Sequence, residues 1–333
     1  MNELNNLIKQ ANRVYRDNFP NNTWFERALF FSWSCAIKDC AFCYMSTQKK
    51  KNRDDGDDRA VRSKESLYAE TIICKHLGWK IGFFTGGVNA YQKPDITEML
   101  EVINQIIEEK IWVSLGPIPK SHLKEYQPYI KGVVGSIETV NRELHKKVCP
   151  SKPMEPYVKM FNNSTLLGLK NAMTLILGLG ETKDDFETLK EFIEENNIKK
   201  IHLYALNPVK GTLFENKESP SKEYHAWYVA KTRIAFPKID IQMGIWKDKI
   251  DRIPLLLEAG TNSISKFPII REFRSKSAKE IENQAKKTGR NFLGSLTTIP
   301  NVNWDKEVDK LSLDQEMKEK VRLKLKQYLR NMS

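Results

Sequence analysis

Eight short runs of apolar and β-branched residues recur along the chain, and a stretch with helical spacing follows each run. The runs are residues 28–34, 80–86, 111–116, 132–138, 172–178, 200–207, 240–244 and 262–267. Strands that alternate with helices pair in parallel. No linker interrupts the alternation, whereas an open doubly wound sheet would need a break in it. The pattern therefore predicts an α/β fold, a closed (β/α)8 barrel of the TIM type.

The chain outside this pattern has helical spacing. We expect an N-terminal helical extension over residues 1–22, the barrel over 23–275, and a C-terminal helical extension over 276–333 that packs on the barrel. The most basic stretch, residues 317–330, carries apolar residues at helical intervals. This spacing favours the solvated face of a docked helix over a nucleic-acid patch. The rest of the net charge of +12 is interleaved with acidic residues, so nucleic-acid binding is not expected.

Targeting signals are not evident in the sequence. No apolar run approaches the roughly 18 residues that a membrane-spanning helix needs. The amphipathic first residues lack the apolar core of a signal peptide. Five cysteines, an odd number, favour a reducing compartment over a disulfide framework. We therefore expect a cytoplasmic protein without membrane association.

Three of the cysteines, Cys35, Cys40 and Cys43, follow the first predicted strand within nine positions. A parallel barrel carries its chemistry at this end of its strands. A structural zinc site needs four ligands, and Cys74 and Cys149 are distant in sequence and expected to be incidental. Three thiolates can instead hold a [4Fe–4S] cube and leave its fourth iron open to a small molecule. A non-enzymatic zinc or cluster protein remains the alternative.

The stretch FSWSCAIKDCAFCYMS (31–46) resembles the signature of the radical S-adenosylmethionine (SAM) superfamily. That signature reads C-x3-C-x2-C after the first barrel strand, whereas the first gap here holds four residues. The resemblance implies one [4Fe–4S] cluster on Cys35, Cys40 and Cys43. It also implies that SAM chelates the open iron and that Phe42 stacks on adenine.

Four further motifs stand at the ends of predicted strands and are similar to elements of the biotin-synthase-like subgroup, which includes a hydrogenase maturase. They are FFTGG (83–87), SIETVNRELHKKVCP (136–150), TLILGLGET (174–182) and LYALNPVKGTLFE (203–215). The SAM contacts that the resemblance implies are Phe42, Tyr44, Thr85, Gly86, Gly87, Ser136, Glu138, Tyr157, Ile176, Leu206 and Asn207. Tyr157 stands where the subgroup often has an arginine near the SAM carboxylate, so the partner of that carboxylate is left open.

Substrate contacts are expected from polar residues that face the barrel interior. Strand alternation places Ser114, Tyr204, Gln242, Ser263 and Ser265 inward, with packing inside the barrel as the alternative. His202 is expected to be a core histidine. The other histidines, His76, His122, His145 and His225, are expected at the surface. Basic residues on the predicted top loops are candidates to hold an acidic substrate: Lys210, Lys247, Lys266, Arg271 and Arg274.

Within this subgroup, the widened cysteine gap and the single cluster are similar to the radical SAM proteins encoded with [Fe]-hydrogenase in methanogens. The similarity implies a small-molecule substrate on the route to the guanylylpyridinol cofactor. It also implies a reduced electron donor such as ferredoxin or flavodoxin. The alternative is a maturase of another cofactor, hydrogenase-maturase-like or biotin-synthase-like. Sulfur insertion is not expected, because the strands offer no cysteines for a second cluster.

Overall fold

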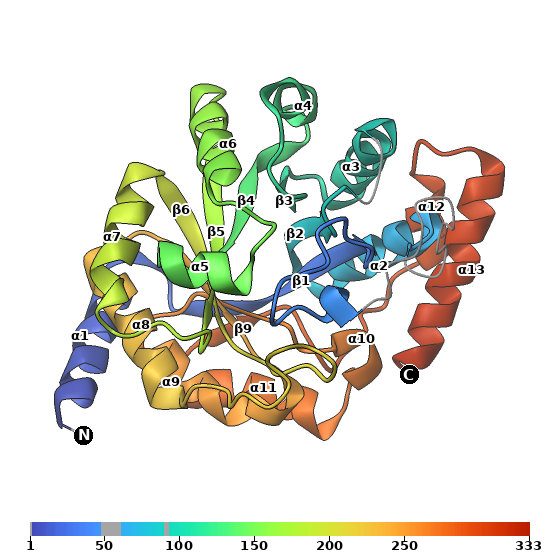
Figure 1. The fold of residues 1–333 in the computed structure, drawn as a ribbon. Coiled ribbons are helices and arrows are strands. Elements are labelled where there is room, and N and C mark those ends of the chain that lie inside the picture. The colour runs from blue at the N-terminus through green and yellow to red at the C-terminus, as the bar shows by residue number, and fades with distance from the viewer. Residues whose placement is uncertain (1, 48–60, 90–92) are drawn as a thin grey trace.

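The computed structural model describes residues 2–47, 61–89 and 93–333 (Figure 1). Parallel strands β1 to β8 follow one another around a barrel, and β1 closes it by pairing with both β2 and β8. The barrel strands are β1 (Asn22–Ser32), β2 (Lys80–Gly86), β3 (Ile111–Ser114), β4 (Ile130–Glu138), β5 (Lys170–Leu177), β6 (Ile198–Ala205), β7 (Asp240–Gly244) and β8 (Ser263–Ser265). The predicted (β/α)8 fold class is confirmed.

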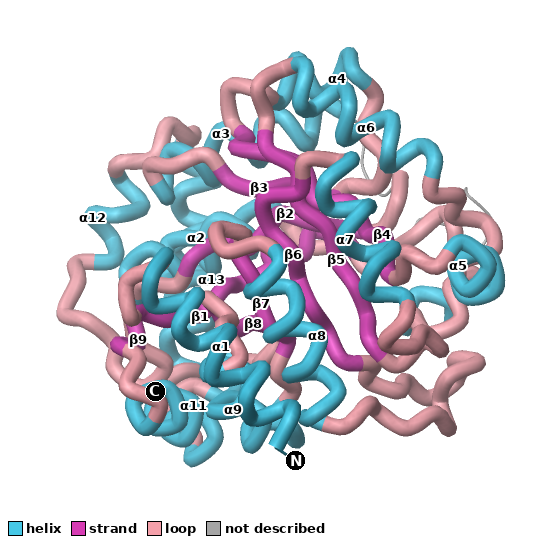
Figure 2. Tube along the Cα trace, turned by 90° about the vertical axis from the view of Figure 1, so that its left-hand side faces the viewer, coloured by secondary structure: helices cyan, strands magenta, loops and turns pink. Residues whose placement is uncertain are grey.

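Helices surround the barrel (Figure 2). They are α1 (Asn2–Asn18), α2 (Lys64–Leu77), α3 (Lys93–Ile107), α4 (Lys120–Tyr126), α5 (Arg142–Val148), α6 (Glu155–Leu166), α7 (Asp185–Glu195), α8 (Lys222–Ala235), α9 (Ile253–Glu258), α10 (Ile269–Glu272), α11 (Lys276–Lys287), α12 (Trp304–Asp309) and α13 (Gln315–Asn331). Short 3-10 helices η1 (Tyr44–Thr47) and η3 (Lys247–Arg252) lie in loops. The terminal helices cover different sides of the barrel, α1 against α8 and α13 against α2 (Figure 1).

Two elements differ from the sequence prediction. β1 begins at Asn22 rather than at residue 28, because polar residues that face inward interrupt its apolar pattern. The C-terminal extension is not wholly helical: β9 (Asn291–Leu293) pairs in parallel with the first residues of β1, before β2 joins β1 at Glu26. A three-residue strand is too short to leave a periodic signal in the sequence.

An apolar layer fills the middle of the barrel. Ala28, Phe83, Trp112, Val134 and Ala172 pack together there from five consecutive strands. The Phe83 ring meets the His202 ring edge-on at 5.1 Å between centroids, and these residues belong to β2 and β6, which are not neighbours in the sheet. This contact therefore crosses the barrel interior.

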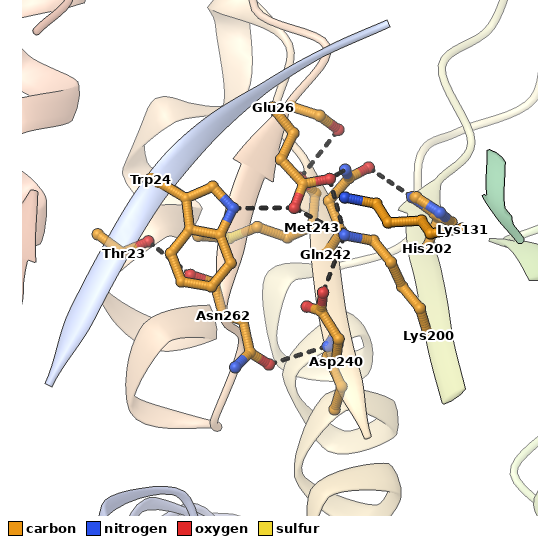
Figure 3. Close-up of polar contacts among 12 residues, drawn as sticks. Thr23, Trp24, Glu26, Lys131, Lys200, His202, Asp240, Gln242, Met243 and Asn262 are labelled. Carbon is orange, nitrogen blue, oxygen red and sulfur yellow. Dashed lines mark hydrogen bonds and ion pairs between the residues drawn. The ribbon is translucent and has the colours of Figure 1, made fainter. Parts of the chain in front are cut away.

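A buried ion network closes the barrel at the amino ends of its strands (Figure 3). The Lys200 ammonium lies 2.7 Å from Glu26 Oε1 and 2.9 Å from Asp240 Oδ2. The Trp24 indole also donates to Glu26 at 2.9 Å. Burial opposes ionisation of Glu26, but the charge of Lys200 outweighs it and lowers the pKa of Glu26 to about 2. The side chains of Glu26, Lys200 and Asp240, here called the plug, therefore fill this end of the barrel, and we expect the chemistry at the other end.

We expect Glu26→Gln to destabilise the protein. The substitution leaves the buried Lys200 with Asp240 alone, and breaking a buried ion pair costs about 3 kcal/mol or more. Urea unfolding followed by circular dichroism measures the loss. Glu143→Gln, which removes an exposed pair with Lys146, is the matched control and should leave the midpoint unchanged. Equal midpoints for the two variants would contradict the role assigned to the plug.

Acid should destabilise the protein through its buried histidines. Burial lowers the pKa of His202 to about 3 and that of His225 to about 4, from 6.5, and it also lowers the pKa of His145. Below pH 6.5 the unfolded chain takes up protons at these residues that the folded chain does not. The free energy of unfolding therefore falls as the pH drops, approaching about 1.4 kcal/mol per pH unit for His202 and for His225. Urea titrations between about pH 7 and pH 5 measure the slope, and His202→Asn should lower it by up to about 1.4 kcal/mol per pH unit; an unaltered slope would contradict the assignment.

Candidate active site

The three clustered cysteines lie on a loop at the carboxyl end of β1, and their thiols are free and partly exposed. Backbone hydrogen bonds hold this loop on two sides. The Ala36 N–H donates to the Val88 carbonyl after β2 at 3.0 Å, and the Ala41 N–H donates to the Val148 carbonyl at the end of α5 at 2.8 Å. The loop is therefore held between the segment that follows β2 and the end of α5, next to or within two of the motifs that the sequence singled out.

Gly87 packs directly against the cysteine loop. A Cβ atom at this position would lie 1.7 Å from the Ser34 carbonyl oxygen, closer than any side chain allows. The second glycine of the FFTGG motif is therefore required by this contact, whatever else it binds. Thr85 of the same motif donates its hydroxyl to the Ser114 carbonyl at 2.8 Å, which ties β2 to β3.

Cys149, expected to be a small buried or incidental residue, is buried and lies against the cysteine loop. Its side chain is 1% exposed and packs with Ala41, Leu179 and Leu206. The Cys149 thiol hydrogen bonds to that of Cys40 and lowers the pKa of Cys40, although burial opposes the shift. Cys40 is thereby favoured as a thiolate, the form that binds metal.

The donor set suits a cluster better than a single ion. Within the described ranges, no three His, Cys, Asp or Glu side chains are already assembled around one point. In a [4Fe–4S] cube each thiolate binds its own iron, so its ligands stand further apart than those of one zinc ion. Partly exposed thiols on one anchored loop fit that requirement.

A buried ion pair faces this loop from β4. Glu138 is the last residue of β4 and has a φ of 65°, a backbone conformation that residues other than glycine rarely adopt. Its carboxylate accepts from the Lys152 ammonium at 2.8 Å and from the Thr174 hydroxyl at 3.3 Å. Burial opposes the charge of Lys152, but Glu138 outweighs it and raises the pKa of Lys152 well above its usual value. A strained backbone conformation at a strand end is often found at functional positions, which makes Glu138 a candidate.

Lys152 is the site residue that the sequence analysis missed. It is 6% exposed, and it lies in the turn between α5 and α6. Tyr157, which occupies the place of the subgroup's arginine, is buried beside this charge, and its hydroxyl has no hydrogen-bond partner within the described residues. The basic residue beside Tyr157 is therefore Lys152, from the turn between α5 and α6. Only its position five residues before Tyr157 could have suggested this.

A cluster of apolar side chains joins the cysteine loop to the ends of β5 and β6. Phe42, Ile176 and Leu206, each expected beside adenine, belong to one cluster with Leu179 and Phe214. The adjoining turn is ordered by Glu181, whose carboxylate accepts from the N–H groups of residues 178–180. The structure therefore brings the three expected adenine contacts together.

The other expected SAM contacts lie along the same rim. Gly86 ends β2, while Ser136 near the end of β4 and Asn207 after β6 are partly exposed. Tyr44 opens η1 and is 42% exposed. No observation of this structure tests their roles, which remain expectations.

The expected substrate residues are all buried. They are Ser114, Tyr204, Gln242, Ser263 and Ser265. The Tyr204 hydroxyl donates to Gln242 Oε1 at 2.9 Å, and the Ser265 hydroxyl donates to the Met243 carbonyl at 3.3 Å. Two histidines expected at the surface, His145 and His225, are instead buried. His225 reaches inward from α8 to the Leu203 carbonyl at 3.1 Å, a tertiary contact that helical spacing does not reveal.

Comparison with known proteins agrees with this geometry. The sequence model of the radical SAM superfamily matches residues 34–193, from the cysteine loop through α7. An uncharacterized protein of Methanocaldococcus jannaschii is 38% identical over 313 residues, which cover 92% of this chain and 86% of that protein. The chain belongs to the radical SAM superfamily. Its cofactors are accordingly a [4Fe–4S] cluster and SAM.

More distant similarities place this radical SAM protein near known enzymes. A biotin synthase of Methanococcus vannielii is 28% identical over 182 residues, 54% of each chain. The crystal structure of methylornithine synthase aligns with a TM-score of 0.72 at 17% identity, covering 86% of this chain and 88% of that one. The structure of the [FeFe]-hydrogenase maturase HydG of Carboxydothermus hydrogenoformans aligns with a TM-score of 0.70 at 16% identity, covering 98% of this chain and 82% of that one. Both solved structures share the fold of this chain.

No helix among the described residues is long and apolar enough to cross a membrane.

Lys152→Met should destabilise the protein by about 3–5 kcal/mol, because it leaves the Glu138 carboxylate buried without its cation. The free energy of unfolding in urea measures the effect. Lys146→Met, on the exposed face of α5, is the control and should leave the midpoint where it is. A Lys152→Met midpoint equal to that of the control would mean that the ion pair contributes nothing.

Proposed function

We propose that this radical SAM enzyme cleaves SAM reductively and directs the product radical at a small molecule inside the barrel. The observation that carries the proposal is the assembly at one rim of three free thiols, the buried Glu138–Lys152 pair and the apolar cluster of Phe42, Ile176 and Leu206. A cluster held by these thiols would supply one electron to SAM and so break its C5′–S bond, giving methionine and a 5′-deoxyadenosyl radical able to abstract hydrogen from an unactivated C–H bond.

The chain's own residues bind, orient and shield the reactants in this proposal. Cys35, Cys40 and Cys43 hold the cluster. The residues around Thr85, Gly86 and Gly87 meet the SAM amino group, and Glu138 holds the ribose or amino group. Lys152, the cation beside Glu138, is the candidate partner of the SAM carboxylate. The closed barrel excludes water and competing hydrogen donors from the reacting atoms.

For the pathway, we propose a step in the biosynthesis of the pyridinol of the [Fe]-hydrogenase guanylylpyridinol cofactor, the role ascribed to the proteins called HmdB or HcgA. The widened cysteine gap and the three-thiol loop support this proposal. A reduced ferredoxin or flavodoxin is the proposed electron donor. The second candidate is maturation of another cofactor, favoured by the similarity to biotin synthase.

Anaerobic reconstitution tests the radical reaction. The protein should hold about four irons per chain and, with dithionite and SAM, form 5′-deoxyadenosine. Cys40→Ala should abolish 5′-deoxyadenosine, whereas Cys74→Ala, which alters a buried thiol of α2, should retain it. Bound zinc in place of iron, or SAM left intact by several reductants, would refute the proposal. Transfer of deuterium from labelled pyridinol precursors into 5′-deoxyadenosine then distinguishes the two pathways.

A further inference from the structure

Lys266 is a cation at the mouth of the barrel that forms no ion pair with any carboxylate of the described residues. It directly follows β8, with a φ of 70°. Its ammonium lies 4.6 Å from the centroid of the Tyr204 ring, on β6. Among the described residues, no acidic side chain forms an ion pair with it, whereas Lys152 and Lys200 are both paired with carboxylates. Lys266 thus differs from Lys152 and Lys200, the two buried lysines of the barrel.

The intervening strand leaves room for this arrangement. Gly244 ends β7 between β6 and β8, and a Cβ there would lie 2.5 Å from Tyr204 Cδ1 and 3.1 Å from Lys266 Cγ. Any larger residue would displace the aromatic ring or the lysine stem. The sequence at three strand ends is therefore adapted to hold an ammonium over a ring.

Unpaired polar atoms lie on the strand positions below Tyr204. Gln242 Oε1 accepts from the Tyr204 hydroxyl at 2.9 Å and lies 2.7 Å from His202 Nδ1, while the Gln242 amide donates to Glu26 (Figure 3). Because Gln242 Oε1 can only accept, His202 carries its proton on Nδ1. His202 Nε2 is then a bare acceptor, buried without a partner among the described residues, and the Ser263 hydroxyl is also unpaired.

Lys266 also lies at the reactive rim. It follows β8, and in this parallel barrel the ends of β8, of β1 with its cysteine loop and of β4 with Glu138 lie at the same rim. An anion bound at Lys266 would therefore lie between the cluster loop and the polar strand positions below Tyr204. That is where a substrate must lie for a radical formed at the rim to reach it.

We propose that Lys266 binds the carboxylate of a small acidic substrate above the Tyr204 ring. This inference rests on the proposed function, because it names the chemical class of the molecule on which the radical acts. The Lys266 ammonium is only partly exposed and forms no ion pair among the described residues, so a bound carboxylate would supply it with charge-assisted hydrogen bonds. One lysine with no arginine fork in contact suits a carboxylate better than a phosphate.

Binding of matched acids and amides tests the inference. Reconstituted protein with bound SAM is titrated, by ligand-observed NMR, with monocarboxylates from acetate to 4-hydroxyphenylacetate and with the carboxamide of each. At least one acid should bind about tenfold more tightly than its amide, a difference of about 1.4 kcal/mol. Lys266→Met and Lys266→Gln should remove this preference, and Lys266→Arg should retain it. Lys190→Met, which alters an exposed lysine of α7 paired with Glu187, should keep it.

Two results would overturn the inference. One is a wild-type protein that shows no preference for any acid over its amide. The other is a preference that survives Lys266→Met and Lys266→Gln while both weaken SAM binding, which would assign Lys266 to SAM. The titration needs no reductant, so it is independent of SAM cleavage. Wild-type protein that forms 5′-deoxyadenosine without an acid preference refutes this inference alone, and failure to form 5′-deoxyadenosine refutes the proposed function.

Discussion

The buried contact of Lys200 with Glu26 and Asp240 determines which end of the barrel can do chemistry. Glu26 lies on β1 and Lys200 on β6, strands that are not neighbours, so their contact crosses the interior (Figure 3). Charges this deeply buried persist only when they are paired. The amino ends of the strands are thus filled by a satisfied ion network. The free thiols of the cysteine loop and the positive-φ residue Glu138 lie instead at the carboxyl ends.

At that rim, packing explains features that the family motif alone leaves unexplained. The cysteine loop is held by backbone hydrogen bonds to a residue that follows β2 and to the last residue of α5. Position 87 must be glycine, because the loop leaves no space for a Cβ atom there. The cation that faces Glu138 comes from the turn after α5 rather than from α6, where Tyr157 lies.

Most of the fold and of the candidate cluster site could be predicted from the sequence. The alternation of strands and helices is a local signal, and Cys35, Cys40 and Cys43 lie within one short loop. The clustering of Phe42, Ile176 and Leu206 agrees with the positions expected from the motifs. The start of β1 and the short β9 were missed because inward-facing polar residues and a three-residue length leave no periodicity.

The sequence by itself determined the barrel, the loop with three thiols and the order of the motifs around the rim, because each depends on residues close together in the chain. Only the tertiary structure decided that Cys149 lies against Cys40, that Lys152 pairs with Glu138, and that Lys266 stands over Tyr204 without a carboxylate. Such contacts join residues from different strands and loops. Their partners are chosen by barrel closure and burial, which a one-dimensional pattern does not record.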